Sequence, residues 1–261
     1  MAHPSAQRSK KGILPKPKPP VYSKPSVQTN PILANRATIA GVNLTSLIRR
    51  PKAKLFGKKQ SAKFVLDSNT WEWNKSNNLL MYRFGTEKRS TRIAAFDFDG
   101  CLVKTSLYQR EPDAWSVLFP KKTEAVLHEL SDNGYKLVII SNQGGIGRAK
   151  KSKNEEISKV KTRVTSFIGE MQSKKELPMD VLISTNKQSV FHKPDVGMWN
   201  FFKENLNGDV KIDMEKSFYV GDAAGRRTDF ADSDAKFAKS AGLQFFNEKQ
   251  FFVQSGYKKL L

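Results

Sequence analysis

The chain has 261 residues and a formal net charge of +20, from 45 Lys and Arg against 25 Asp and Glu. That length suits one α/β domain with an additional segment, and the single cysteine excludes an internal disulfide and a zinc site built from several cysteines. Neither a membrane-spanning apolar run nor a secretory signal is visible, so we expect a soluble intracellular protein.

A basic arm is predicted over residues 1–60, followed by one folded domain over residues 61–261. The first 66 residues hold fourteen Lys or Arg and no acid, together with eight of the twelve prolines. Because proline opposes both helix and strand, we expect this arm to be disordered.

Several uses of the basic arm stay open. It could bind nucleic acid by releasing counterions, carry a nuclear address in residues 49–54 and 58–59, or act as an acid-free mitochondrial transit sequence. A solvating tail without a fixed partner is the plainest alternative. We favour DNA binding or the nucleus over the mitochondrion, because the cations are mostly Lys and the prolines oppose an amphipathic helix.

Residues 64–84 predict a hairpin, since two apolar and aromatic runs flank an Asn-rich polar stretch. The hairpin should cover one edge of the domain or lead into the first central strand, with its aromatics in the core rather than stacked on bases. The apolar run 93–96 then predicts a buried strand that ends in Asp97 and Asp99, and Gly100 allows a sharp turn. Taken alone, this stretch also fits an ordinary strand-to-turn junction.

A helix is predicted from Pro120 to Gly134, and the apolar strand 136–142 follows it. This strand ends in two polar residues, Ser141 and Asn142. The glycine-rich loop that comes next leaves backbone amides free to approach a phosphate closely.

Asn154 is expected to cap a long helix whose apolar residues recur at helical spacing. The strand 179–184 comes next. Lys193 then lies on a loop, because Pro194 biases it toward an extended conformation, and residues 195–202 predict a further helix.

The strand over residues 217–222 ends in a further acid, Asp222. Alternating strands and helices predict an α/β fold with a parallel sheet, helices on both faces and right-handed crossovers. The carboxyl ends of parallel strands share one edge, where ligands bind. The strand ends should therefore bring one set of polar side chains to this rim: Asp97, Asp99, Ser141, Asn142, Lys193 and Asp222.

This set suits the hydrolysis of a phosphate monoester, which needs charge neutralisation, an in-line nucleophile and an acid for the leaving alcohol. We assign the attack on phosphorus, through an aspartyl-phosphate, to Asp97. Asp99 would protonate the leaving oxygen and then activate the water that releases phosphate. Mg²⁺ suits the carboxylates of Asp97 and Asp222. The remaining phosphate oxygens would be held by backbone amides and by Ser141, Asn142 and Lys193.

The segments Asp97-Phe98-Asp99, Ser141, Lys193 and Gly221-Asp222 resemble, in order, the four motifs of the haloacid dehalogenase superfamily of phosphohydrolases. The resemblance implies a Rossmann-like fold, the phospho-aspartate route, and Mg²⁺ dependence with the backbone carbonyl of Asp99 as a further ligand. It implies a phosphatase rather than an ATPase, because the first motif has its second Asp. The short spacing from Asp99 to Ser141 leaves no room for a large cap domain.

Longer stretches resemble the phosphatase domain of the polynucleotide kinase 3'-phosphatase family, over about residues 71–254. The substrate of that family is the 3'-phosphate at a DNA strand break, so the resemblance implies a DNA-repair enzyme that leaves a 3'-hydroxyl. No Gly-x4-Gly-Lys-Ser/Thr loop occurs, which favours the stand-alone phosphatase form over one with a 5'-kinase. The stretches that carry the resemblance are residues 115–120, 134–148, 193–199 and 219–226.

One position departs from the family pattern, because Cys101 stands where Thr is usual, and one hydroxyl hydrogen bond is expected to weaken. A cysteine-based phosphatase is excluded, since its Cys-x5-Arg spacing would need Arg where Leu107 stands. Two alternatives stay open: a small-molecule phosphatase of the same superfamily, and a catalytically silent DNA-binding scaffold. The small-molecule phosphatases usually carry a cysteine-rich zinc loop, which a single cysteine cannot supply. A catalytically silent scaffold conflicts with the presence of a complete set of catalytic residues.

Some surrounding residues keep two interpretations. Arg226 either contacts substrate or braces its loop, and Arg148 either contacts a phosphate or belongs to a solvated basic turn. Asp229 either orients the lysine or the metal site, or caps a helix, as we expect for Asp232 and Asp234. We expect a monomer that binds DNA ends, with a basic arm that can engage other repair proteins.

Overall fold

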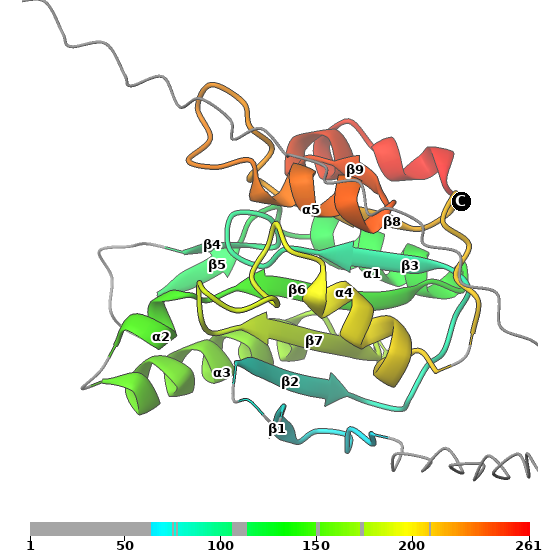
Figure 1. The fold of residues 1–261 in the computed structure, drawn as a ribbon. Helices are drawn as coiled ribbons and strands as arrows, with labels where there is room; N and C mark the ends of the chain where they lie inside the picture. The colour runs from blue at the N-terminus through cyan, green and yellow to red at the C-terminus, as the bar shows by residue number, and fades with distance from the viewer. Residues whose placement is uncertain are drawn as a thin grey trace, which may run out of the picture. The chain divides into compact units, whose positions relative to one another are not determined.

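The computed structural model describes residues 64–74, 76, 78–105, 114–149, 152–172, 175–208 and 210–261. All of them belong to the unit Lys58–Leu261, and the arm predicted for residues 1–60 lies outside the described residues. In this part of the chain, seven strands form one sheet in the order β1-β2-β7-β6-β3-β8-β9 (Figure 1). The strands are β1 (Trp71–Trp73), β2 (Leu79–Phe84), β3 (Ile93–Phe96), β6 (Lys136–Asn142), β7 (Met179–Ser184), β8 (Phe218–Val220) and β9 (Gln244–Phe246).

The sheet is mixed rather than wholly parallel. Strands β7, β6, β3, β8 and β9 pair in parallel, as the alternation of strands and helices predicts. The hairpin predicted over residues 64–84 is confirmed, and its strand β2 pairs antiparallel with β7 at one side of the sheet. The expected parallel sheet therefore describes the centre of the fold, and the hairpin adds an antiparallel edge.

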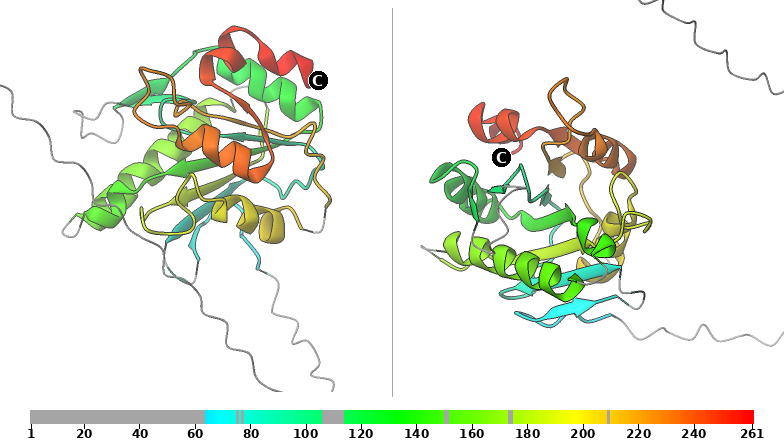
Figure 2. Two further views of the ribbon diagram at one scale, coloured as in Figure 1. Left: turned by 45° about the horizontal axis from the view of Figure 1, so that its top comes forward. Right: turned by 90° about the vertical axis from the view of Figure 1, so that its left-hand side faces the viewer.

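Helices cover both faces of the sheet, as predicted (Figure 2). Along β3, Ala94 and Phe96 face one hydrophobic cluster while Ile93 and Ala95 face the other, because successive strand residues alternate between faces. The first face is covered by α1 (Lys122–Asp132), α3 (Lys153–Glu170), η2 (Lys249–Val253) and η3 (Gly256–Lys259). The second face is covered by α4 (Gly197–Phe201), the π-helix η1 (Phe202–Leu206) and α5 (Ser233–Ala241).

Strand β3 lies at the centre of the sheet, between β6 and β8, and all four of its residues are buried. Its last residue, Phe96, packs against the rings of Phe218, Phe251 and Phe252 at centroid distances of 6.1, 5.7 and 6.2 Å. Burial of such a ring contributes roughly 1.5–3 kcal/mol. The end of β3 is therefore anchored by aromatic residues that come from the C-terminal part of the chain.

Three expected elements differ in detail. The helix expected to be capped by Asn154 begins at Lys153, with Ser152 at the N-cap position and Asn154 inside the first turn. The helix expected over 195–202 is the short α4, which continues as the π-helix η1. The strand expected over 217–222 is confined to β8.

The described residues between Asp99 and Ser141 form a small two-stranded sheet, α1 and the first part of β6, consistent with the absence of a large cap. Residues 106–113 are not among the described residues. The small sheet consists of β4 (Val103–Thr105) and β5 (Trp115–Val117). None of the described helices has the length and apolar composition that crossing a bilayer requires.

Candidate active site

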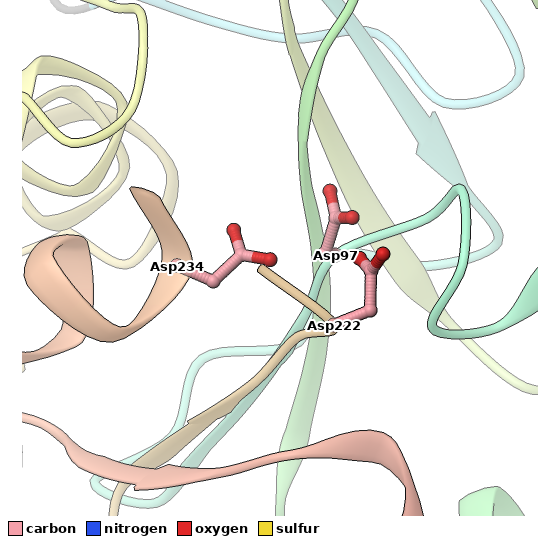
Figure 3. A group of neighbouring side chains, drawn as sticks. All are labelled: Asp97, Asp222 and Asp234. Atoms are coloured by element: carbon pink, nitrogen blue, oxygen red, sulfur yellow. The ribbon is translucent and has the colours of Figure 1, made fainter. Parts of the chain in front are cut away.

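Three carboxylates converge beyond the ends of β3 and β8 (Figure 3). Asp97 directly follows β3, and its backbone N–H donates to the carbonyl of Val220 at 2.8 Å, which extends the strand pairing to the site. Asp222 follows β8 by two residues, and Asp234 lies in the first turn of α5. Each of these acids has an oxygen within 4.8 Å of an oxygen of the other two.

The ammonium of Lys193 joins this cluster from the loop between β7 and α4. Its Nζ lies 2.7 Å from Asp97 Oδ1 and 2.8 Å from Asp234 Oδ1, and it donates to the hydroxyl of Tyr219 at 2.6 Å. Burial lowers the pKa of Lys193, but Asp234 and Asp97 outweigh that effect and raise it above its usual value. Lys193 is therefore a fixed cation beside the predicted nucleophile.

Asp234 holds Lys193 in place rather than capping a helix. Its Oδ1 faces the ammonium, and its Oδ2 accepts a hydrogen bond from the backbone N–H of Ala223 at 3.0 Å. The hydroxyl of Tyr219 lies 3.3 Å from Asp234 Oδ1 and 3.0 Å from the carbonyl of Ile140. The interpretation of Asp234 as a cap is thus wrong, because the turn after β8 folds back so that this buried carboxylate meets the lysine.

The cluster has more negative charge than Lys193 can balance. Burial raises the pKa of Asp97 well above its usual value, an effect that Lys193 opposes and that Asp234 and Asp222 increase. Burial, together with Asp234, raises the pKa of Asp222 to about 6. Asp222 Oδ1 is buried and has no hydrogen-bond partner among the described residues.

These observations fit a divalent cation. Carboxylate oxygens are the ligands that Mg²⁺ prefers, and a cation would balance the buried charge and give Asp222 Oδ1 a partner. Asp97 and Asp222 can supply these oxygens. Asp234 lies within reach, but its two oxygens are engaged by Lys193 and by the Ala223 amide.

Gly100 brings the loop after Asp99 against Asp222. Its φ is +83°, in the left-handed region, and a Cβ placed there would lie 2.4 Å from Asp222 Oδ2. Glycine is needed at this position for both reasons. The sharp turn expected after Asp97 and Asp99 is therefore confirmed, and it packs directly on Asp222.

The carboxylate of Asp99 is held by side chains from two other elements. Gln143 Nε2 donates to Asp99 Oδ2 and lies 3.4 Å from Ser141 Oγ. Arg163 of α3 donates to Asp99 Oδ1 at 3.0 Å. Asp99 thus lies on the same side of the site as Ser141, the buried hydroxyl predicted to bind phosphate.

The structure gives the amide of Asn142 a partner other than the phosphate expected for it. Asn142 Nδ2 donates to the carbonyl of Lys193 at 3.0 Å, and Asn142 Oδ1 accepts the Lys193 N–H at 2.9 Å. Both polar atoms of the side chain are used in this way. Asn142 therefore fixes the lysine loop at the end of β6.

Arg226 braces the loop after Asp222. Its guanidinium pairs with Asp229 at 2.9 Å and Glu248 at 3.1 Å, and Nη2 donates to the carbonyl of Asp222 at 2.9 Å. Asp229 also accepts the backbone N–H of Arg226, so it organises this loop and does not orient Lys193. Of the two interpretations of Arg226, the geometry favours the bracing one.

Arg148, which had two interpretations, and Asp232, which was expected to cap a helix, make none of the contacts described above. Arg148 is exposed at the end of the short helix α2 (Gly145–Arg148). Asp232 stands at the N-cap position of α5 without a side-chain cap hydrogen bond, and it pairs instead with Lys236 at 2.8 Å. The expected cap is thus wrong in its hydrogen bonding, although the position is right.

Cys101 keeps a hydrogen bond where the family pattern has a threonine. Its thiol donates to the carbonyl of Val220 at 3.4 Å, and the residue is fully buried. Burial raises the pKa of the thiol well above its usual value, so it stays protonated. A thiolate nucleophile at Cys101 is therefore excluded on physical grounds as well as by spacing.

Sequence reasoning missed the roles of four residues: Tyr219, Asp234, Gln143 and Arg163. Tyr219 offered one signal, a hydroxyl within an apolar strand that should be buried. An acid in the first turn of a helix, as at Asp234, usually serves the helix itself. Gln143 and Arg163 gave no local signal, because their contacts with Asp99 depend on how α3 and the loop after β6 fold back.

Comparison with known proteins agrees with this geometry. Residues 92–252 match the family model described as Polynucleotide kinase 3 phosphatase. A polynucleotide 3'-phosphatase of Arabidopsis thaliana is 42% identical over 175 residues, which are 64% of this chain and 24% of that protein. A bifunctional polynucleotide phosphatase/kinase of Schizosaccharomyces pombe is 32% identical over 185 residues, 70% of this chain and 42% of that protein.

Two further similarities concern a viral protein and a solved structure. An uncharacterized 20.8 kDa protein of Autographa californica nuclear polyhedrosis virus is 36% identical and covers 67% of this chain and 92% of its own length. The crystal structure of a HAD-like phosphatase from Mesorhizobium loti aligns with a TM-score of 0.50 at 18% identity, over 64% of this chain and 77% of that one. That likeness shows the fold. The chain spans about a quarter of the plant relative and less than half of the yeast one.

Proposed function

The chain belongs to the polynucleotide kinase 3 phosphatase family, and from this membership and the site geometry we propose that it removes the 3'-phosphate from DNA strand ends. The observation that carries the proposal is one cluster that joins the buried Asp97 and Lys193 to the half-buried Asp222. All three residues lie within the matched segment 92–252. The plant and yeast relatives are named for phosphatase activity on polynucleotides, which supports the substrate class.

In the proposed reaction, an oxygen of Asp97 attacks phosphorus and the bond from phosphorus to the 3'-oxygen breaks, which leaves an aspartyl-phosphate. Asp99 gives a proton to the departing 3'-oxygen, and then takes one from the water that hydrolyses the intermediate. The proton balance closes over the two steps, because Asp99 ends in the state in which it began.

Lys193 and Ser141 would hold the phosphate oxygens. Lys193 Nζ already lies 2.7 Å from Asp97 Oδ1, so a phosphoryl group on Asp97 would lie beside a fixed positive charge. Asn142 and Asp234 keep that cation in place through its backbone and its side chain. Mg²⁺, held by Asp97, Asp222 and the backbone carbonyl of Asp99, would neutralise charge on the phosphate.

The place of action is part of the proposal. The basic, proline-rich residues 1–60 and the net charge of +20 support DNA binding and a nuclear location, with the mitochondrion as the alternative. DNA repair follows from the substrate, since a 3'-phosphate must be converted to a 3'-hydroxyl before a polymerase or ligase can act. Other repair proteins are proposed as partners of the arm, and the enzyme is proposed to act as a monomer.

The deciding experiment is phosphate release from a 3'-phosphorylated DNA oligonucleotide, with and without Mg²⁺, by the full chain and by Asp97→Asn. The same sequence phosphorylated at its 5' end and histidinol phosphate serve as competing substrates. We expect Mg²⁺-dependent release from the 3' end, abolished by Asp97→Asn. Preference for histidinol phosphate would overturn the substrate and leave the chemistry, whereas no release from any substrate would favour a DNA-binding scaffold.

A further inference from the structure

Arg163 lies on α3 and contacts Asp99. The sequence alone indicated no functional role for this helix. Arg163 Nη1 donates to Asp99 Oδ1 at 3.0 Å, while Gln143 Nε2 donates to the other oxygen, Oδ2. The same Gln143 nitrogen lies 3.4 Å from Ser141 Oγ. The carboxylate is thus held at both oxygens, with Oδ2 on the side of the predicted phosphate site.

Helix α3 is fixed against this motif at a second point. Phe167, one turn beyond Arg163, packs edge to face on Phe98 with a centroid distance of 5.5 Å. Phe98 lies between the two catalytic acids, and both phenylalanines are buried. Residues four apart on a helix lie on the same face, so the packing of Phe167 sets the position from which Arg163 reaches Asp99.

The ion pair between Arg163 and Asp99 contributes little to folding stability. The two side chains retain 20% and 28% of their accessible surface, and partly exposed pairs of this kind contribute about 0–1 kcal/mol. Across the pair, the guanidinium can only donate hydrogen bonds. Its geometric effect is to hold Oδ1 and thereby direct Oδ2 toward Gln143 and Ser141.

We propose that Arg163 is a positioning residue for the reaction, which fixes the carboxyl of Asp99 so that its second oxygen meets the leaving oxygen of the phosphate ester. This inference rests on the proposed function in one respect, the role of Asp99 in proton transfer to the leaving group. It adds Arg163 as the residue that orients the carboxyl group of Asp99 for that transfer. A positioned acid contributes about 10²–10⁴-fold to a rate, so misdirection of its carboxyl should be measurable.

The dependence on the leaving group separates this role from a structural one. A sugar or alkyl alkoxide needs a proton as it departs, whereas nitrophenolate departs readily without one. Misorientation of Asp99 should therefore lower kcat/KM, which reports the steps up to release of the alcohol, for alkyl phosphates and leave kcat/KM for p-nitrophenyl phosphate nearly unchanged. Damage to the fold, the lysine or the metal site would slow both.

The experiment measures kcat and KM for Arg163→Met with three substrates: a 3'-phosphorylated oligonucleotide, glycerol 2-phosphate and p-nitrophenyl phosphate. We expect kcat/KM to fall about 10–100-fold for the first two and less than about 3-fold for the third. The value of kcat also includes hydrolysis of the shared aspartyl-phosphate, in which Asp99 acts as base, so it does not separate the leaving groups. Arg163→Lys should recover part of the loss, since it keeps a cation. Lys159→Met is the matched control, because Lys159 lies one turn away on α3 and pairs with Glu155.

A double-mutant cycle completes the test. If Arg163 acts through Asp99, then Arg163→Met should add less than about 2-fold to the loss in Asp99→Asn. Equal losses of kcat/KM on all three substrates, additive losses in the cycle, or an unchanged kcat/KM on the alkyl esters would each overturn the proposal. Hydrolysis of glycerol 2-phosphate without hydrolysis of the oligonucleotide would reject the proposed substrate, while the comparison of leaving groups would still decide the role of Arg163.

Discussion

The ammonium nitrogen of Lys193 lies 2.7 Å from Oδ1 of Asp97, the proposed nucleophile, and both side chains are buried. This pair links the end of β3 to the loop after β7. Lys193 also supplies the positive charge that balances Asp97 and Asp234, because no other described cation comes within 4.0 Å of either carboxylate.

Lys193→Met should remove both activity and stability. Without the ammonium, Asp97 and Asp234 remain buried without a compensating charge, which costs about 3–5 kcal/mol of unfolding free energy. We expect phosphate release to fall at least about 100-fold, because a preorganised cation is lost from the phosphoryl group. Urea titration and a phosphate-release assay measure the two effects.

Two companion variants make the test of Lys193 specific. Adding Asp234→Asn to Lys193→Met should recover part of the stability without any activity, because it removes a buried charge and restores no cation. Lys239→Met, an exposed residue of α5, should change neither quantity. A Lys193→Met protein as stable as the native chain would contradict the pairing.

Stability in the absence of divalent metal should depend on pH through Asp222. Its pKa is raised from 3.8 to about 6 in the folded chain, so the folded state binds a proton more tightly than the unfolded state. That contribution to stability is complete below about pH 4 and is lost as the pH rises through about 6. Metal-free protein should therefore lose stability between about pH 4 and 7 by this term.

The measurement is the thermal unfolding midpoint against pH, compared with Asp222→Asn, which lacks this titration. The native chain should show a decline between about pH 4 and 7 that the variant lacks, and Mg²⁺ should raise the midpoint more at pH 7 than at pH 5. Parallel curves for the two proteins would show that Asp222 has no raised pKa.

Gly100→Ala should damage the site in a way that the same change at a glycine of the same backbone conformation does not. A methyl group at Gly100 would lie 2.4 Å from Asp222 Oδ2, and the φ of +83° itself disfavours alanine by about 1–2 kcal/mol. Gly134 has the same φ of +83°, but a methyl group there would meet no atom within 4 Å. We expect both variants to lose similar backbone stability, and Gly100→Ala alone to lose activity at least about 10-fold. Equal activity of the two variants would contradict the close approach.

Arg226→Gln should weaken the response to metal without weakening DNA binding. The arginine holds the carbonyl of Asp222 and pairs with Asp229 and Glu248, so its loss should loosen the carboxylate that follows β8. We expect a roughly 10-fold higher Mg²⁺ requirement for activity, in line with the effect of residues that orient metal ligands. The KM for a 3'-phosphorylated oligonucleotide should stay within about 2-fold; a rise in KM at saturating Mg²⁺ would instead assign Arg226 to substrate contact.

The strand ends of this site were predictable, because buried parallel strands appear as continuous apolar runs and each run here ends in a polar residue. That pattern placed Asp97, Ser141 and Asp222 on one rim without any knowledge of packing. It also identified β6 and β7 with their observed bounds.

The roles of residues that meet the site only through tertiary folding of distant segments were not predictable. Asp234 resembles an ordinary acid at a helix start until the loop after β8 brings it to Lys193. Arg163 is one of several cations on α3, and only the docking of Phe167 on Phe98 distinguishes it. For Asn142 the position was right, but its preference for the backbone of Lys193 over a ligand is a property of the loop after β7.

The central place of β3 also affects synthesis of the chain. Asp97 bonds to β8, Gly221 bonds to Phe246 of β9, and Phe96 packs on Phe251 and Phe252. A nascent chain that has emerged from the ribosome as far as α5 would already carry every proposed catalytic side chain and Phe218. It would still lack Phe251 and Phe252, which complete the aromatic packing on Phe96. Catalysis should therefore begin only after Phe246, Phe251 and Phe252 have emerged and folded back against β3 and β8.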